Sequence, residues 1–190
     1  MSDANALLSP AQSVPSPHAE EAWLDGVAQG SKEAFSALYE SCYPAVYAYV
    51  LSVLRNRDDA DDAAQETFLH IRSAAHLYRA QGKPMAWMLT IAKNVCMMQF
   101  RRQSRESSYD ADEIPFSDDL VVIDNHDDRL ALEAALKLLS AEECRIVLLH
   151  AVSGLKHREI AALLELPLAT VLSKYNRSLK KLRRNLEDAS

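Results

Sequence analysis

Glycine is scarce in this chain of 190 residues, which contains only four copies. Loops that cradle phosphates need closely spaced glycines, so a P-loop or dinucleotide-binding enzyme is not expected. The sequence is instead rich in Ala and Leu that recur with helical periodicity. The combination predicts an all-α protein.

Paired cysteines, ligand clusters and long apolar runs are also lacking. Cys42, Cys96 and Cys144 are odd in number and far apart, which argues against a disulfide framework or zinc finger and fits a reducing cytoplasm. The six histidines show no ligand spacing, and no Ser/His/Asp or Cys/His constellation stands out. We therefore expect no catalytic residue, metal or cofactor. No run is long enough to span a bilayer and the N-terminus has no signal-like segment, so we expect a cytoplasmic protein without membrane insertion.

Charge of one sign is missing from one segment and scarce in another. The net charge is −6, which is unexpected for a protein that binds DNA. However, residues 171–190 hold six Lys or Arg against two Asp or Glu, whereas residues 107–128 hold eight acidic side chains and no Lys or Arg. This segregation indicates a cationic C-terminal surface, which the total conceals.

Two helical patterns with a very short break between them follow Gly154. The second begins after Pro167, a residue that suits the first turn of a helix. Its apolar stripe is Leu168, Val171, Leu172, Tyr175, Leu179, Leu182 and Leu186. The other faces carry cationic and hydrogen-bonding side chains, so the pair predicts a helix-turn-helix whose outer face enters a major groove. An ordinary amphipathic helix with a solvated face is the alternative.

The first half of the chain reads as several packed helices. Residues 1–19 lack periodicity and predict a disordered tail. Ser31 caps a long helix that ends near Leu54, and Asp58 is the expected cap of the next, over 58–75. The buried stripe of that helix would be Ala60, Ala63, Ala64, Thr67, Phe68, Ile71 and Ala75. Its outer face is either a solvated surface or a docking surface for a basic partner.

A loop over 76–84 leads into a further helix. Trp87, Asn94 and Arg101 are spaced seven residues apart and fall close to one line along it. A tryptophan, an amide and an arginine beside a loop with Arg79 and Lys83 could hold unpaired bases. The alternative is that Trp87 belongs to the core.

Four segments together carry a family resemblance: EAFSALYESCYPAVYAYV, RDDADDAAQETF, MAWMLTIAKN with the following FRR, and the long segment from LSAEECRIVLL through LKKLR. In this order and spacing they resemble regions two and four of bacterial sigma factors. The two-domain layout is similar to that of the extracytoplasmic-function (group IV) members of the sigma-70 family. The resemblance implies a disordered tail over 1–19, region two over 20–104, an acidic flexible linker over 105–128 that threads through the polymerase, and region four over 129–190.

The resemblance also implies partners: the β′ clamp helices and β subunit of core RNA polymerase, promoter DNA and an anti-sigma factor. The residues that correspond to the docking surface are Asp61, Asp62, Gln65, Glu66 and Leu69. Those that correspond to minus-ten recognition and melting are Arg79, Lys83, Trp87, Lys93, Asn94, Arg101 and Arg102. Those that correspond to minus-thirty-five recognition are Thr170, Ser173, Lys174, Asn176, Arg177, Lys180 and Lys181.

The chain departs from the family pattern at four positions. Glu165 stands where the family usually has glycine in the turn, and a left-handed conformation there would cost about 1 kcal/mol. Ala169 and Leu172 replace residues that are commonly glycine and basic, and Met98 stands where an aspartate is common. These differences indicate a subgroup with its own promoter preference.

The sequence thus predicts a promoter-specificity subunit of RNA polymerase, not an enzyme, that binds DNA together with core and responds to a stress through an anti-sigma factor. The alternative is a dimeric helix-turn-helix regulator that binds DNA without polymerase. That alternative gives no role to the acidic helix over 58–66 or to the loop near Trp87.

Overall fold

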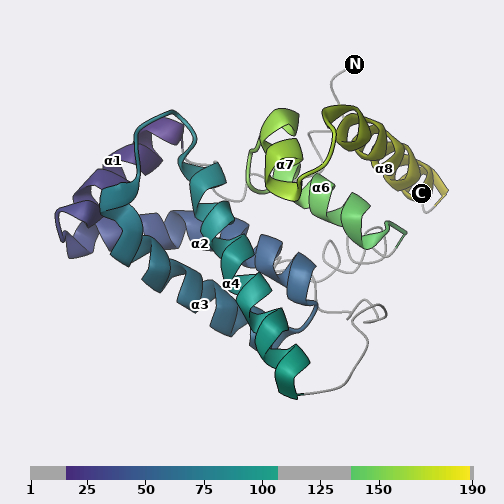
Figure 1. Ribbon diagram of the computed structural model, residues 1–190. Helices are drawn as coiled ribbons and strands as arrows, with labels where there is room; N and C mark the ends of the chain where they lie inside the picture. Colours follow the sequence, from purple (N-terminus) through teal and green to yellow (C-terminus); the bar gives the residue numbers. More distant parts are fainter. Residues whose placement is uncertain (1–15, 107–137, 189–190) are drawn as a thin grey trace.

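The computed structural model describes residues 16–106 and 138–188, and within these ranges it contains helices and no strand. Two groups of helices lie side by side (Figure 1). The first group is α1 (Pro17–Ala28), α2 (Lys32–Leu54), α3 (Arg57–Ala74), the short 3₁₀ helix η1 (Ala75–Leu77) and α4 (Pro84–Glu106). The second is α6 (Ala141–Ala151), α7 (His157–Leu164) and α8 (Leu168–Asp188). The expected all-α fold is confirmed.

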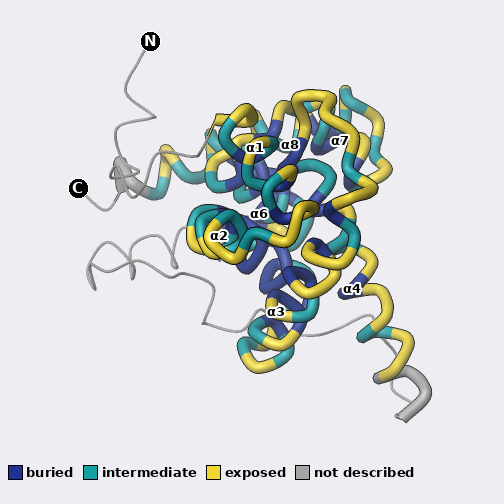
Figure 2. Tube along the Cα trace, turned by 90° about the vertical axis from the view of Figure 1, so that its left-hand side faces the viewer, coloured by how far each residue is buried: buried dark blue, intermediate teal, exposed yellow. Residues whose placement is uncertain are grey.

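Helix α2 lies at the centre of the first group and packs against α1, α3 and α4. Its N-terminus is capped as the sequence predicts, because Ala34 N donates to Ser31 Oγ at 3.1 Å. Much of its length is buried, including Leu38, Val46 and Val50 at 0% exposure. In Figure 2 the segments coloured dark blue, which are buried, lie mainly where the helices meet.

Helix α3 presents six residues of the predicted stripe to α2 and α4; all seven are buried, and the seventh, Ala75, begins η1. The predicted cap is wrong: Asn56, and not Asp58, is the N-cap, and its Oδ1 accepts from Asp59 N at 3.1 Å. Asp58 is in the first turn, where a carboxylate is still favoured by the helix dipole. Helix α1 likewise begins at Pro17, inside the predicted tail; residues 1–15 lie outside the described residues.

Helices α6, α7 and α8 form a compact unit around Val171 and Ile160, both fully buried. Glu165 closes α7 in the left-handed conformation, at φ 57°, and Leu166 N donates to Ala161 O at 3.0 Å. The turn that joins α7 to α8 is therefore short, as a helix-turn-helix requires. One part of the predicted stripe of α8 is wrong: Leu172 is 40% exposed, whereas Ser178, which the stripe left out, is fully buried.

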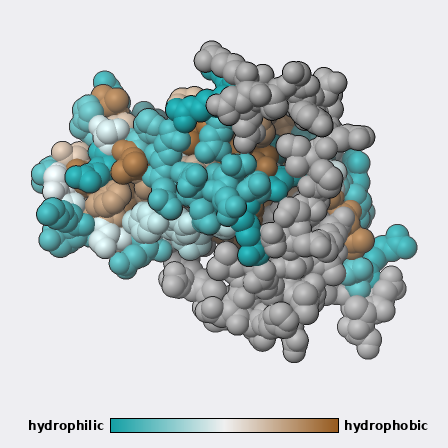
Figure 3. Space-filling model, turned by 90° about the horizontal axis from the view of Figure 1, so that it is seen from below, coloured by the Kyte–Doolittle hydropathy of each residue, from teal (hydrophilic) through white to brown (hydrophobic). Residues whose placement is uncertain are grey.

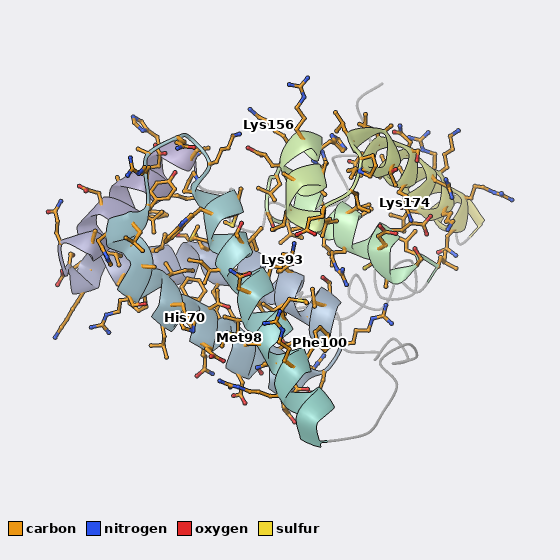
Figure 4. The ribbon with its side chains drawn as sticks, in the orientation of Figure 1. His70, Lys93, Met98, Phe100, Lys156 and Lys174 are labelled. Carbon is orange, nitrogen blue, oxygen red and sulfur yellow. The ribbon has the colours of Figure 1, made fainter. Side chains whose placement is uncertain are left out.

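The two groups of helices are packed against each other through α2 with α6 and α4 with α7. Arg145 in α6 donates from Nη2 to Ser52 O of α2 at 3.3 Å. Lys93 reaches from α4 toward α7, where its Nζ donates to Leu163 O at 3.1 Å and to Glu165 Oε1 at 2.6 Å (Figure 4). One continuous apolar cluster includes buried residues of both groups.

The three cysteines are free and buried, which confirms that they belong to the core. Burial raises the pKa of the Cys96 thiol to about 12 and that of Cys144 to about 11, and it also raises the pKa of Cys42. The reactive thiolate is therefore disfavoured at all three positions. None of the described helices is long and apolar enough to cross a membrane.

Glu20 is a carboxyl group in the core, 2% exposed, and burial raises its pKa to about 7. Glu20 therefore keeps its proton in the folded chain up to about pH 7, whereas the unfolded chain releases it near pH 4.5. The free energy of unfolding consequently falls as pH rises from about 4.5 to 7. We expect Glu20→Gln to remove this loss and to raise Tm by a few degrees at pH 8, but much less at pH 5. Thermal unfolding followed by circular dichroism at both pH values measures the difference; equal Tm shifts at the two pH values would contradict the assignment.

Candidate nucleic-acid and protein interfaces

The outward face of α3 carries the predicted docking residues on one surface. Asp62 and Gln65 are exposed, Asp61 and Glu66 are half-buried, and Leu69 is 63% exposed. Glu66 Oε1 lies 3.6 Å from His70 Nε2, one helical turn further along. The structure brings together carboxylates and an apolar side chain, as a surface that binds a cationic helix requires.

Asp61 is held in place by α2. Its Oδ1 accepts from the Tyr43 hydroxyl at 3.1 Å, and burial together with this carboxylate raises the pKa of Tyr43. Tyr43 stacks in turn on Tyr47, at 5.6 Å between ring centroids. Tyr47 is buried and Tyr43 is half-buried, so both rings contribute to the core, and the hydroxyl of Tyr43 orients one member of the acidic face.

The loop over 78–83 is anchored to α1 by Glu21, a residue that the sequence reading missed. Glu21 Oε1 accepts from the Tyr78 hydroxyl and from Gly82 N, both at 2.8 Å. These two donors lower the pKa of Glu21, so it stays ionised at neutral pH. Gly82 adopts φ 69°, a conformation that glycine allows without strain. No local pattern signals this contact, because Tyr78 and Gly82 lie 57 and 61 residues after Glu21 in the sequence.

Near that loop, α4 presents a mixed polar and aromatic face. Trp87 is half-buried and packs on Tyr78, at 5.3 Å between ring centroids, so it serves the core at least in part. The remaining predicted minus-ten residues that are exposed are Arg79, Lys83, Asn94, Arg101 and Arg102. Lys93 is the exception, because it is directed to α7 and paired with Glu165.

Helix α8 divides its predicted DNA residues between two faces. Ser173, Asn176, Arg177 and Lys180 are exposed, whereas Thr170, Lys174 and Lys181 are half-buried. Lys174 pairs with Glu142 of α6, and Lys181 Nζ lies 2.7 Å from Glu143 Oε2. Two of the predicted lysines therefore fasten α8 to α6, while Ser173, Asn176, Arg177 and Lys180 face outward.

Glu143 is the acidic group on which this fastening depends. It is 4% exposed and completes a capping box with Ser140 at the start of α6. Although burial raises the pKa of Glu143, hydrogen bonds from Lys181 and Ser140 outweigh it and lower the pKa overall. The charge of Lys181 is therefore paired with Glu143 of the same chain.

In the coloured part of the face seen in Figure 3, hydrophilic residues are the more common and apolar residues form separate patches. The side chains that the structure describes include no cluster of three His, Cys, Asp or Glu that could hold a metal ion.

An all-helical chain that contains both a helix-turn-helix and an exposed acidic helix face has the features of a DNA-binding protein with a protein partner. Comparisons with known proteins define it further. Residues 38–106 match Sigma-70 region 2, and residues 129–182 match Sigma-70 region 4. The chain is 30% identical over 177 residues to the ECF RNA polymerase sigma factor SigK of Mycobacterium ulcerans, covering 89% of this chain and 94% of that protein. The chain belongs to the extracytoplasmic-function RNA polymerase sigma factors, a family that directs promoter-specific initiation and is not enzymatic.

Other relatives agree with this family. The ECF sigma factor SigX of Bacillus subtilis is 23% identical over 165 residues, covering 82% of this chain and 85% of its own. CnrH, solved with the cytosolic domain of CnrY, has a TM-score of 0.60 at 22% identity and covers 90% of this chain and 99% of its own. RpoE of Bartonella quintana, solved with the anti-sigma factor NepR, has a TM-score of 0.62 at 24% identity and covers 80% and 96%. The solved structures support the fold.

Replacing Glu21 tests the anchoring of the loop. We expect Glu21→Ala to reduce promoter melting several-fold, because the loop loses two hydrogen bonds from its charged acceptor. Binding to core polymerase should stay unchanged, since Glu21 lies outside the docking residues predicted on α3. Permanganate reactivity of minus-ten thymines in the open complex measures melting.

The matched control is Asp25→Ala, an exposed acidic residue on the same helix whose side chain accepts from Gln29. Equal melting by the two variants would show that the contact of Glu21 has no role in opening DNA.

Proposed function

We propose that this chain carries core RNA polymerase to a set of promoters through three surfaces: the outward face of α3, the loop over 78–83 with α4, and the outward face of α8. Region two would extend over 20–104 and region four over 129–190. The two are joined by the acidic linker over 105–128, of which residues 107–128 lie outside the described residues. The observation that carries the proposal is the presence of all three surfaces on a chain of this family.

The face of α3 is proposed to bind the clamp helices of β′. Asp62, Gln65 and Leu69 are exposed and lie on one side of a helix whose other side is fully packed. Their carboxylate, amide and apolar groups complement a basic amphipathic helix. Asp61 and Glu66 already have partners within the chain, so they are oriented before the polymerase arrives.

The DNA contacts are proposed to be divided by element. Arg79, Lys83 and Asn94 would hold the unpaired minus-ten strand, whose opening costs a few kcal/mol of stacking. Ser173, Asn176 and Arg177 would reach base edges at the minus-thirty-five element, and Lys180 would contact phosphate. Because Lys174 and Lys181 are paired within the domain, we assign them to hold α8 at the correct angle.

While the two domains are packed together, they cannot contact the minus-ten and the minus-thirty-five elements of a promoter at the same time. The elements lie about 25 base pairs apart, which is about 85 Å along B-DNA. A compact protein of this length has a radius of gyration of only about 16 Å. We infer that α6 and α7 leave α2 and α4 when the chain binds core, which frees Lys93 for DNA.

An anti-sigma factor is the expected regulator. CnrH was solved with the cytosolic domain of CnrY, and RpoE was solved with the anti-sigma factor NepR. Both share the fold of this chain. We propose that a partner of the same class holds this chain inactive in the bacterial cytoplasm until a stress releases it. Its identity requires a search for proteins bound to the full chain.

Charge reversal on α3 tests the proposed function. We expect Asp62→Arg/Glu66→Arg to weaken binding to core more than tenfold, because like charges would then face each other across the interface. Run-off transcription with purified core on a promoter pool should show selective initiation with the unaltered chain and its loss with this variant.

The control is Asp25→Arg/Glu40→Arg, which makes the same change in net charge at exposed positions of α1 and α2. Equal loss in both variants would show a general charge effect. Tight, specific DNA binding without core, together with no initiation from any promoter, would instead favour a dimeric regulator.

A further inference from the structure

Leu172 is a large apolar side chain on the outward face of α8. It is 40% exposed, and it is the one exposed large hydrophobic residue among the described side chains of α6, α7 and α8. The buried side of the helix is filled by Val171 and Ser178, both at 0%. Leu172 therefore does not complete the core, although the sequence pattern had placed it in the apolar stripe.

The neighbours of Leu172 belong to the surface that we assign to DNA. Asn176 lies one helical turn further on the same face, and Ser173 is the next residue; both are exposed. Leu172 is the fifth residue of α8, which begins at Leu168. The N-terminal part of a recognition helix is the part that contacts base edges in a helix-turn-helix.

The largest apolar group on the base edges of the major groove is the C5-methyl group of thymine. The hydrogen-bond donors and acceptors of the other base edges gain nothing from a leucine. We propose that Leu172 contacts a thymine methyl group in the minus-thirty-five element and so determines the base at that position. The inference rests on the proposed function of α8, because it requires that this face lie in the groove.

The positions of Leu172 and Asn176 on one helix face indicate how an apolar and a polar contact with the bases would combine. Asn176 can pair with N6 and N7 of an adenine, while Leu172 covers a methyl group near it. Polar and apolar contacts on adjacent positions of one helix face would then favour a short A·T-containing step. A basic residue at position 172 would instead contact phosphate or guanine, so the leucine changes what is read.

The test replaces the thymine methyl group alone. After run-off transcription has identified a promoter, each thymine of its minus-thirty-five element is changed in turn to deoxyuridine, which keeps every hydrogen-bonding group. We expect one substitution to weaken binding of the holoenzyme about fourfold, the effect of removing one buried methyl-sized group. When the holoenzyme carries Leu172→Ala, the ratio of its affinity for the thymine DNA to its affinity for the deoxyuridine DNA should fall to near one.

The matched control is Lys180→Ala on the same helix. It should weaken binding to both DNAs, as loss of a phosphate contact does, and keep the fourfold ratio. Because Leu172 is exposed and alanine is a good helix former, the leucine variant should fold; an unchanged Tm verifies this.

The outcomes separate the two levels of the proposal. No deoxyuridine effect at any position, or an effect that persists in Leu172→Ala, would overturn the methyl contact while initiation remained. Loss of affinity for a protein partner in Leu172→Ala, with no change in the DNA ratio, would also overturn it. If the chain directed no initiation on any promoter, the proposed function itself would fail, and the assignment of Leu172 with it.

Discussion

The burial of α2 is the constraint on which the rest of the structure depends. This helix packs against α1, α3, α4 and α6, so it joins the core of the first group of helices to the second. Leu51 and Leu54 near its end are 2% and 4% exposed, and Ser52 accepts from Arg145 of α6. Contacts with α2 orient α3 and α4. They therefore also orient the acidic face of α3 and the loop over 78–83 that leads into α4.

Several carboxylates of this chain, whose net charge is −6, are paired with cationic or polar groups of the chain itself. Glu21 anchors a loop, Glu142 and Glu143 fasten α8, and Glu165 holds Lys93. Each carboxylate orders a cationic or polar element nearby. The exposed cations of α8 then remain a local feature, so attraction to phosphate is confined to one face and is screened by salt.

Local patterns predicted the fold well because helix periodicity and caps are local. The stripe of α3 was correct at every position, and Ser31 is the cap expected for α2. Contacts made at long range escaped prediction: nothing near Glu21 in sequence indicates that it binds a loop about 60 residues away, and the pairing of Lys93 with Glu165 joins residues 72 apart. Leu172 was misplaced because helical periodicity alone does not reveal which edge of a stripe is left uncovered.

Energy transfer between the two groups of helices tests the central claim, that they are packed in the free chain and separate in use. Dyes on Ser36→Cys and Ala162→Cys, both exposed, would label selectively because the native cysteines are buried. The account predicts efficient transfer in the free protein, a partial decrease in Glu165→Gly, and a large decrease in the complex with core polymerase and promoter DNA. Transfer that stays equally efficient in an active initiation complex would contradict it.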